Sequence, residues 1–136
     1  MVMADTDKKI LLVEDDEFLS SLIKNRLHRE NFRVALATDG EEAIEALKKE
    51  TPDLVLLDLI LPKRLGFEVM EEVQNNPEIK RPPFMIISNL SQKEDVKRAQ
   101  DLGAVDYFIK AQIMIDDLIK RVKAFMDAGA DNYVPE

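Results

Sequence analysis

The sequence predicts a doubly wound α/β domain, in which helices cover both faces of one parallel sheet. Five short apolar runs alternate with amphipathic segments along the 136 residues. Several of these runs are almost continuously hydrophobic, which is typical of parallel strands covered on both faces. Alternation of this kind, without an internal repeat or a linker, indicates successive strand-helix units, and for such a domain we expect the strand order 2-1-3-4-5.

The first, third and fourth apolar runs are the most uniform, whereas the second is lighter and is expected at an edge of the sheet. The expected strands are Lys9–Val13, Arg33–Ala37, Leu54–Asp58, Phe84–Ser88 and Tyr107–Ile109.

The segments between the strands place apolar residues at helical spacing. Pro52 marks the end of the second helix, and Gly103 that of the fourth. Ser91 and Glu94 form a capping-box pattern at the start of the fourth. The expected helices are Phe18–Glu30, a segment from Gly40 to Glu50, Phe67–Asn75, a segment from Ser91 to Gly103, and Ile115–Asp127.

Composition limits the classes of function. Hydrophobic residues make up 46% and charged residues 34% of the chain, as in a globular protein with a charged surface. The net charge of −8 argues against direct nucleic-acid binding. No apolar run is long enough to span a membrane, and the first nine residues lack the apolar core of a signal peptide. The absence of cysteine excludes disulfides and thiol chemistry, and a cytoplasmic location is expected.

Carboxylates follow two of the apolar runs. Glu14 and Asp15 come directly after the first strand, and Asp58 ends the third. In a doubly wound fold with the order 2-1-3-4-5, these strand ends lie at the topological switch point, where ligands bind. Three negative charges in one pocket repel each other unless a cation compensates them, and oxygen ligands favour Mg²⁺. We therefore expect a magnesium site here.

Two further strand ends add a hydroxyl and an ammonium group to this region. Ser88 closes the fourth strand, and Lys110 follows the fifth. A carboxylate, a magnesium ion, a hydroxyl and an ammonium around one point would stabilise a phosphoryl group carried on the carboxylate. We expect Asp58 to be the nucleophile that forms an acyl phosphate.

In the order and position of these residues, the chain resembles the receiver domain of bacterial two-component response regulators. The resemblance runs from about Lys8 to Phe125 and implies the flavodoxin-like (βα)5 fold of that family. It rests on the acidic pair after the first strand, on Asp58 with the loop from Leu61 to Gly66, and on Ser88 and Lys110. We expect a receiver domain at residues 8–127, with flexible termini at 1–7 and 128–136.

The resemblance implies a signalling protein and no independent enzyme. A histidine kinase or phosphotransfer protein would donate the phosphoryl group, and Mg²⁺ would be held by Glu14, Asp15, Asp58 and the backbone carbonyl of Ile60. Ser88 would move toward the phosphoryl group and Tyr107 would turn inward.

By the same resemblance, the face formed by the fourth helix, fifth strand and fifth helix would then change and bind a protein partner, with homodimerisation as one outcome. Residues on the first helix, Phe18 and Leu22 among them, would contact the kinase. The charged candidates for pairing on the output face are Lys97, Arg98, Asp101, Asp106, Lys120 and Arg121.

Three departures from the family pattern bear on function. Ala111 stands where a proline commonly follows the lysine, and Asn89 replaces a small residue after the switch hydroxyl, where its size could hinder access to Asp58. Ile60 and Leu90 stand two residues past Asp58 and Ser88. Because apolar side chains cannot orient an attacking water molecule, we expect slow self-dephosphorylation.

Other doubly wound proteins fit less well. A flavin phosphate would be repelled by the acids after the first strand, and no P-loop motif is present. A dehalogenase-type phosphatase needs a second acid two residues after its nucleophile, where this chain has Ile60. The remaining alternative is a pseudo-receiver, an unphosphorylated interaction module of the same fold.

Overall fold

The computed structural model describes residues 8–135 and shows a five-stranded parallel sheet. Its strand order is β2-β1-β3-β4-β5, as predicted, so the light second strand does lie at an edge. The strands are β1 (Lys9–Val13), β2 (Arg33–Ala37), β3 (Leu54–Leu57), β4 (Phe84–Ser88) and β5 (Ala104–Ile109). The helices are α1 (Glu17–Arg29), α2 (Gly40–Lys49), α3 (Gly66–Asn75), α4 (Lys93–Asp101) and α5 (Ile115–Ala128).

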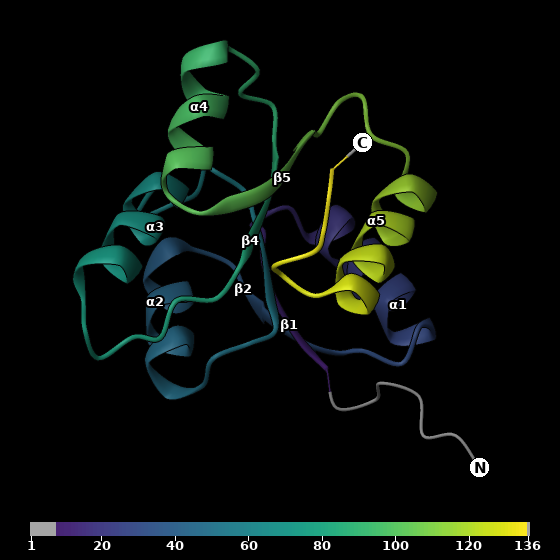
Figure 1. Cartoon of the computed structure of the whole chain (residues 1–136), viewed down its shortest axis with the longest axis horizontal. Helices are drawn as coiled ribbons and strands as arrows, with labels where there is room; N and C mark the ends of the chain where they lie inside the picture. The colour runs from purple at the N-terminus through teal and green to yellow at the C-terminus, as the bar shows by residue number, and fades with distance from the viewer. Residues whose placement is uncertain (1–7, 136) are drawn as a thin grey trace.

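The helices cover both faces of the sheet, and α1 and α5 lie on one face while α2, α3 and α4 lie on the other (Figure 1). Alternate residues of each strand feed the two cores, because side chains along a strand point to opposite faces. In β1, for example, Ile10 packs with α1 and α5, whereas Leu11 packs on the α2 side. Burial of each of these aliphatic side chains stabilises the folded state by about 1.5–3 kcal/mol, so the two covered faces of the sheet make a large contribution to stability.

The helix ends agree with the sequence in part. Asp16 caps α1 by accepting a hydrogen bond from the Leu19 N–H at 3.0 Å, and Gly103, with φ 110°, follows the end of α4. The capping box predicted at Ser91 is wrong, because α4 begins one residue later, with Gln92 at the N-cap and no side-chain cap. No helix within residues 8–135 is long and apolar enough to cross a membrane.

Strand β5 is longer than predicted. It begins at Ala104, and its register against β4 shifts between Phe84 and Met85. Asp106 interrupts its apolar run, so hydrophobicity alone suggests a start at Tyr107. Asp58, predicted as the last residue of a strand, lies one residue beyond β3, although its N–H still donates to the Val13 carbonyl at 3.1 Å.

The segment after α5 turns back toward β5 (Figure 1). The sequence predicts a flexible terminus at 128–136, whereas in the structure Ala128 is the last residue of α5 and Tyr133 contacts Phe125 and Asp106. The Tyr133 ring packs edge-on against Phe125, with the ring centroids 5.4 Å apart, and its hydroxyl donates to the buried Asp106 carboxylate. The predicted flexible residues 1–7, and Glu136, lie outside the described part of the chain.

The tail contact predicts a measurable stability effect. Changing Tyr133→Phe removes one of the donors to the buried Asp106 carboxylate, and we expect the free energy of unfolding to fall by about 1–2 kcal/mol. Urea denaturation measures the change. Val134→Ala is the matched control, because Val134 is 78% exposed and should shift stability by less than about 0.5 kcal/mol. Equal effects of the two substitutions would show that the tail is not held by Tyr133.

Candidate functional site

The ends of β1 and β3 bring two carboxylates together at the switch point of the sheet. The two strands are neighbours, and Val13 pairs with Leu57, so the residues that follow them, Glu14 and Asp58, leave the sheet side by side. Both are buried, with 2% and 4% of their surfaces exposed, whereas Asp15 is exposed. The sheet thus buries two acids and leaves the third open to solvent.

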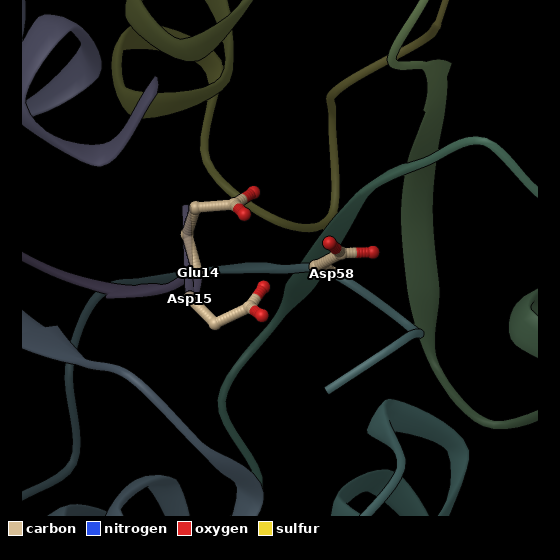
Figure 2. Close-up of side chains that lie close together, drawn as sticks. All are labelled: Glu14, Asp15 and Asp58. Atoms are coloured by element: carbon tan, nitrogen blue, oxygen red, sulfur yellow. The ribbon is translucent and has the colours of Figure 1, made fainter. Parts of the chain in front are cut away.

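The three carboxylates form one cluster. Glu14, Asp15 and Asp58 each offer an oxygen atom, and these atoms lie within 4.8 Å of one another. Figure 2 shows the three side chains close together, two of them from the end of β1. Oxygen donors at this separation suit a hard divalent cation, whose coordination sphere is completed by backbone carbonyls and water.

Lys110 spans the buried pair. Its ammonium group lies 2.6 Å from Asp58 Oδ2 and 3.0 Å from Glu14 Oε1. Burial lowers the pKa of Lys110, but the Asp58 and Glu14 carboxylates outweigh this effect and the pKa is raised above its ordinary value. Lys110 therefore carries a full positive charge at neutral pH.

The pKa of Glu14 is also raised, but here burial is the main cause. Burial raises the pKa of the Glu14 carboxyl above its ordinary value, although the Asp16 N–H and Lys110 both donate to it and oppose the shift. The nearby charge of Asp58 also raises this pKa. One ammonium group thus compensates the acidic cluster only in part.

Ser88 is the last residue of β4. It is fully buried, and its Oγ accepts a hydrogen bond from the Leu90 N–H at 3.3 Å. Its carbonyl accepts from the Lys110 N–H at 2.9 Å. The end of β4 therefore carries the hydroxyl and also anchors the backbone of the lysine.

Tyr107 contacts the same loop from β5. Its hydroxyl donates to the Leu90 carbonyl at 2.6 Å, so the half-buried ring is held by a hydrogen bond as well as by packing. Ser88 and Tyr107 thus bind the N–H and the carbonyl of one residue, Leu90. A movement of either side chain changes the restraint on the β4–α4 loop.

A hollow of about 530 Å³ opens over the acids. Its rim includes the exposed Ile60 and Asn89, and the Asn89 Oδ1 accepts a hydrogen bond from the Ala111 N–H at 2.8 Å. The Ile60 N–H donates to Asp58 Oδ1 at 3.2 Å and so restrains that carboxylate.

Gly66 packs closely against the backbone of Asp58 and Leu59. It is the first residue of α3, and its N–H donates to the Leu59 carbonyl at 2.9 Å. A Cβ atom at this position would lie 2.4 Å from the Asp58 carbonyl oxygen and 2.7 Å from Leu59 Cα. Only glycine allows this close approach.

The structure brings together four of the side chains that the sequence selected for the site. Glu14, Asp15, Asp58 and Lys110 line the hollow, whereas Ser88 and Tyr107 are not part of its lining and instead bind the backbone of Leu90 in the β4–α4 loop. Sequence reasoning missed the contact of Asn89 with Ala111. The available signal was the missing proline, because only a non-proline residue at 111 has an N–H to donate.

Comparison with known proteins identifies the family. The model of the response regulator receiver domain matches residues 10–123. The chain belongs to the response regulator receiver family. This result agrees with the parallel sheet, its strand order and the acidic cluster at the ends of β1 and β3.

Curated members of the family include longer proteins. The receiver is 36% identical over 118 residues to the response regulator ArlR of Staphylococcus saprophyticus, covering 87% of this chain and 52% of that protein. It is 35% identical over 118 residues to the phosphate regulon transcriptional regulatory protein PhoB of Rhizobium meliloti, again covering 87% and 52%. The chain thus spans about half the length of the curated relatives it matches.

Solved receiver structures share the fold. The BeF3-activated receiver domain of Klebsiella pneumoniae RstA aligns with a TM-score of 0.75 and 28% identity, covering 85% of this chain and 96% of that one. The Mn²⁺-bound form of the response regulator Rcp1 aligns with a TM-score of 0.73 and 32% identity, covering 88% and 92%.

The surroundings of the two tyrosines predict unusual behaviour at high pH. Burial raises the pKa of Tyr107 to about 12, and the charges of Asp95 and Asp58 act in the same direction. Burial, together with Asp106, also raises the pKa of Tyr133. The folded protein therefore holds both phenolic protons more tightly than the unfolded chain, and this stabilisation is present below pH 10 and is lost as the pH rises toward 12.

Ultraviolet absorbance of tyrosinate measures this effect. We expect almost no ionisation of Tyr107 at pH 10 in the folded protein, and a fall in the free energy of unfolding between about pH 10 and 12. Tyr107→Phe is the control and should remove the step near pH 12. Ionisation of both tyrosines close to pH 10 while the protein remains folded would contradict the environments described above.

Proposed function

We propose that this receiver is a phosphorylation switch, in which Asp58 accepts a phosphoryl group from a histidine kinase or phosphotransfer protein in a magnesium-dependent reaction. The observation that carries the proposal is the buried Asp58 carboxylate, placed beside two further acids and contacted at 2.6 Å by the Lys110 ammonium. A nucleophile, a cation site and a fixed positive charge thus meet at one point.

The proposed transfer is an in-line displacement at phosphorus. An Asp58 carboxylate oxygen forms a bond to phosphorus while the bond from phosphorus to the donor imidazole nitrogen breaks, and that nitrogen takes up a proton. The product is an acyl phosphate on Asp58. Lys110 stabilises the charge on the phosphoryl oxygens, and Ser88, at the end of the adjacent strand, donates a hydrogen bond to one of them.

Charge balance supports a magnesium requirement. When the three carboxylates are ionised, the single positive charge of Lys110 leaves a net charge of about −2 on the cluster before the phosphoryl group arrives. Glu14, Asp15, Asp58 and the Ile60 carbonyl would hold the ion, which when bound would neutralise phosphoryl oxygens. The related Rcp1 structure, a Mn²⁺-bound form, supports a divalent cation in this family.

The contacts of Leu90 suggest how the switch works. When Ser88 turns its Oγ toward a phosphoryl group, it gives up the hydrogen bond from the Leu90 N–H, and the β4–α4 loop is freed on one side. If Leu90 moves with the loop, the Tyr107 hydroxyl either loses its hydrogen bond to the Leu90 carbonyl or moves together with it. The two rearrangements are coupled through one residue, and they alter the face formed by α4, β5 and α5.

That face is the proposed site for a downstream protein partner or a second copy of the chain. Not all its predicted charges are free for pairing, because Asp106 and Arg121 bind each other at 2.8 Å. The side chains of Lys97 and Asp101 are 77% and 65% exposed and form a surface ion pair at 3.6 Å. Such a pair contributes little to stability, so either residue can pair with a partner protein instead.

A separate apolar region suits the phosphoryl donor. A cavity of about 330 Å³ lies between α1 and the β5–α5 loop, and Lys110 is part of its lining. Three large apolar side chains lie exposed on these two elements: Phe18 at 80%, Met114 at 67% and Leu22 at 37%. A donor helix that packs here would bring its phosphohistidine next to Lys110 and Asp58.

The direct test is the intact mass of the protein after incubation with acetyl phosphate. We expect a gain of one phosphoryl group that requires Mg²⁺, because the ion supplies the missing positive charge. Asp58→Asn keeps the size of the side chain and should abolish the gain. Absence of a gain in folded wild-type protein would instead favour the pseudo-receiver, in which the site serves protein binding alone.

The residues around the hollow predict a long-lived acyl phosphate. Ile60 is 54% exposed at the rim, and neither Ile60 nor Leu90 can orient a water molecule. The double variant Ile60→Asn, Leu90→Glu should therefore lose its phosphoryl group at least about tenfold faster, measured by mass after the donor is removed. Ile60→Leu with Leu90→Ile is the apolar control and should match wild type. A lifetime in the polar variant no shorter than in wild type would contradict this account.

A further inference from the structure

The Asn89 side chain joins the two loops that flank the site. Its Oδ1 accepts a hydrogen bond from the Ala111 N–H at 2.8 Å. One residue earlier on each loop, the Ser88 carbonyl accepts from the Lys110 N–H at 2.9 Å. The N–H groups on both sides of the Lys110 Cα are therefore held by consecutive residues at the end of β4.

The contact combines two of the departures of this chain from the family pattern, Asn89 and Ala111. Only the oxygen end of a carboxamide can accept from an N–H, so the contact fixes the orientation of the Asn89 amide. Ala111 can donate because it has a backbone N–H, which a proline at this position would lack. Asn89 and Ala111 are thus the two halves of one interaction.

Lys110 needs a fixed backbone because its side chain is long and flexible. Its ammonium lies 2.6 Å from Asp58 Oδ2 and 3.0 Å from Glu14 Oε1, and both distances depend on where the main chain begins the β5–α5 loop. Displacement of a reacting group by about 1 Å can reduce a rate by about 100-fold.

We propose that Asn89 is a positioning residue for Lys110, and that it acts through its hydrogen bond with Ala111. The inference rests on the proposed role of Asp58 and Lys110 in phosphoryl transfer. A positioning role and an obstructing role predict opposite effects of the Asn89 side chain on the rate of phosphorylation. Loss of the contact slows phosphorylation, whereas removal of an obstruction would speed it.

A two-by-two set of variants separates the two effects. Asn89→Ala removes the acceptor, Ala111→Pro removes the donor, and the third protein carries both changes. We expect each single change to slow phosphorylation by acetyl phosphate and Mg²⁺ by about three- to tenfold, the size of effect of one hydrogen bond. The combined protein should be no slower than the slower single variant, because both changes remove the same contact.

Two results would overturn the proposal. Faster phosphorylation of Asn89→Ala would mean that the side chain acts as an obstruction, and losses that multiply in the combined protein would mean that the two residues act independently. The contact lies at the solvent edge of the site, so its loss should hardly change the unfolding midpoint, and a thermal unfolding curve confirms that each variant is folded.

Magnetic resonance of unphosphorylated protein gives a readout that does not need phosphoryl transfer. In Asn89→Ala we expect the Ala111 amide hydrogen to exchange at least about threefold faster and the Lys110 ammonium signal to shift. Asn89→Asp retains an oxygen acceptor and should keep the slow exchange. Unchanged exchange and an unchanged Lys110 signal in Asn89→Ala would refute the positioning role. If wild type gains no phosphoryl group but shows these changes, the proposed function fails while the contact stands.

Discussion

The ion pair between Lys110 and the buried carboxylates of Glu14 and Asp58 is the interaction on which the site depends. The three residues follow three different strands, β1, β3 and β5, so their meeting requires the strand order and register of the whole sheet. Glu14 and Asp58 are nearly inaccessible to water, and charges in such surroundings are costly unless a cation compensates them. Lys110 supplies one positive charge and leaves the cluster short of neutrality. The excess negative charge of the cluster is costly in a buried site, and a divalent cation is the kind of ligand that would compensate it.

The other residues of the site are arranged in layers around this ion pair. Asp15 and the rim of the hollow are open to solvent, on the side from which a donor can approach. Ser88 is fully buried at the end of β4, and its hydroxyl accepts a hydrogen bond from the backbone N–H of Leu90. Tyr107 binds the carbonyl of that residue and so connects the interior of the site to β5. The proposed switch would act on the face formed by α4, β5 and α5 through these contacts.

The strands and the acidic residues at their ends could be predicted from the sequence because both depend on local sequence patterns. Continuous apolar runs give the strands, and a carboxylate directly after such a run marks the end of a buried strand whichever residues lie elsewhere. The missed features depend on tertiary contacts. Ser91 has the right side chain for a cap, but α4 begins one residue later. Tyr133 lies in a polar segment, and its position follows from the buried Asp106 on a distant strand. The size of Asn89 is evident from the sequence, whereas the direction of its side chain is not.

We propose that Asp58 itself carries the phosphoryl group, and chemical mapping of the modified residue is the sharpest test of this assignment. Borohydride reduces an acyl phosphate to an alcohol and so converts a phosphorylated aspartate into homoserine, which peptide mass spectrometry locates. We expect homoserine at position 58 in protein treated with a phosphoryl donor and Mg²⁺, and aspartate there in untreated protein. Homoserine at position 15 or 16, or a phosphorylated protein without homoserine at 58, would contradict it.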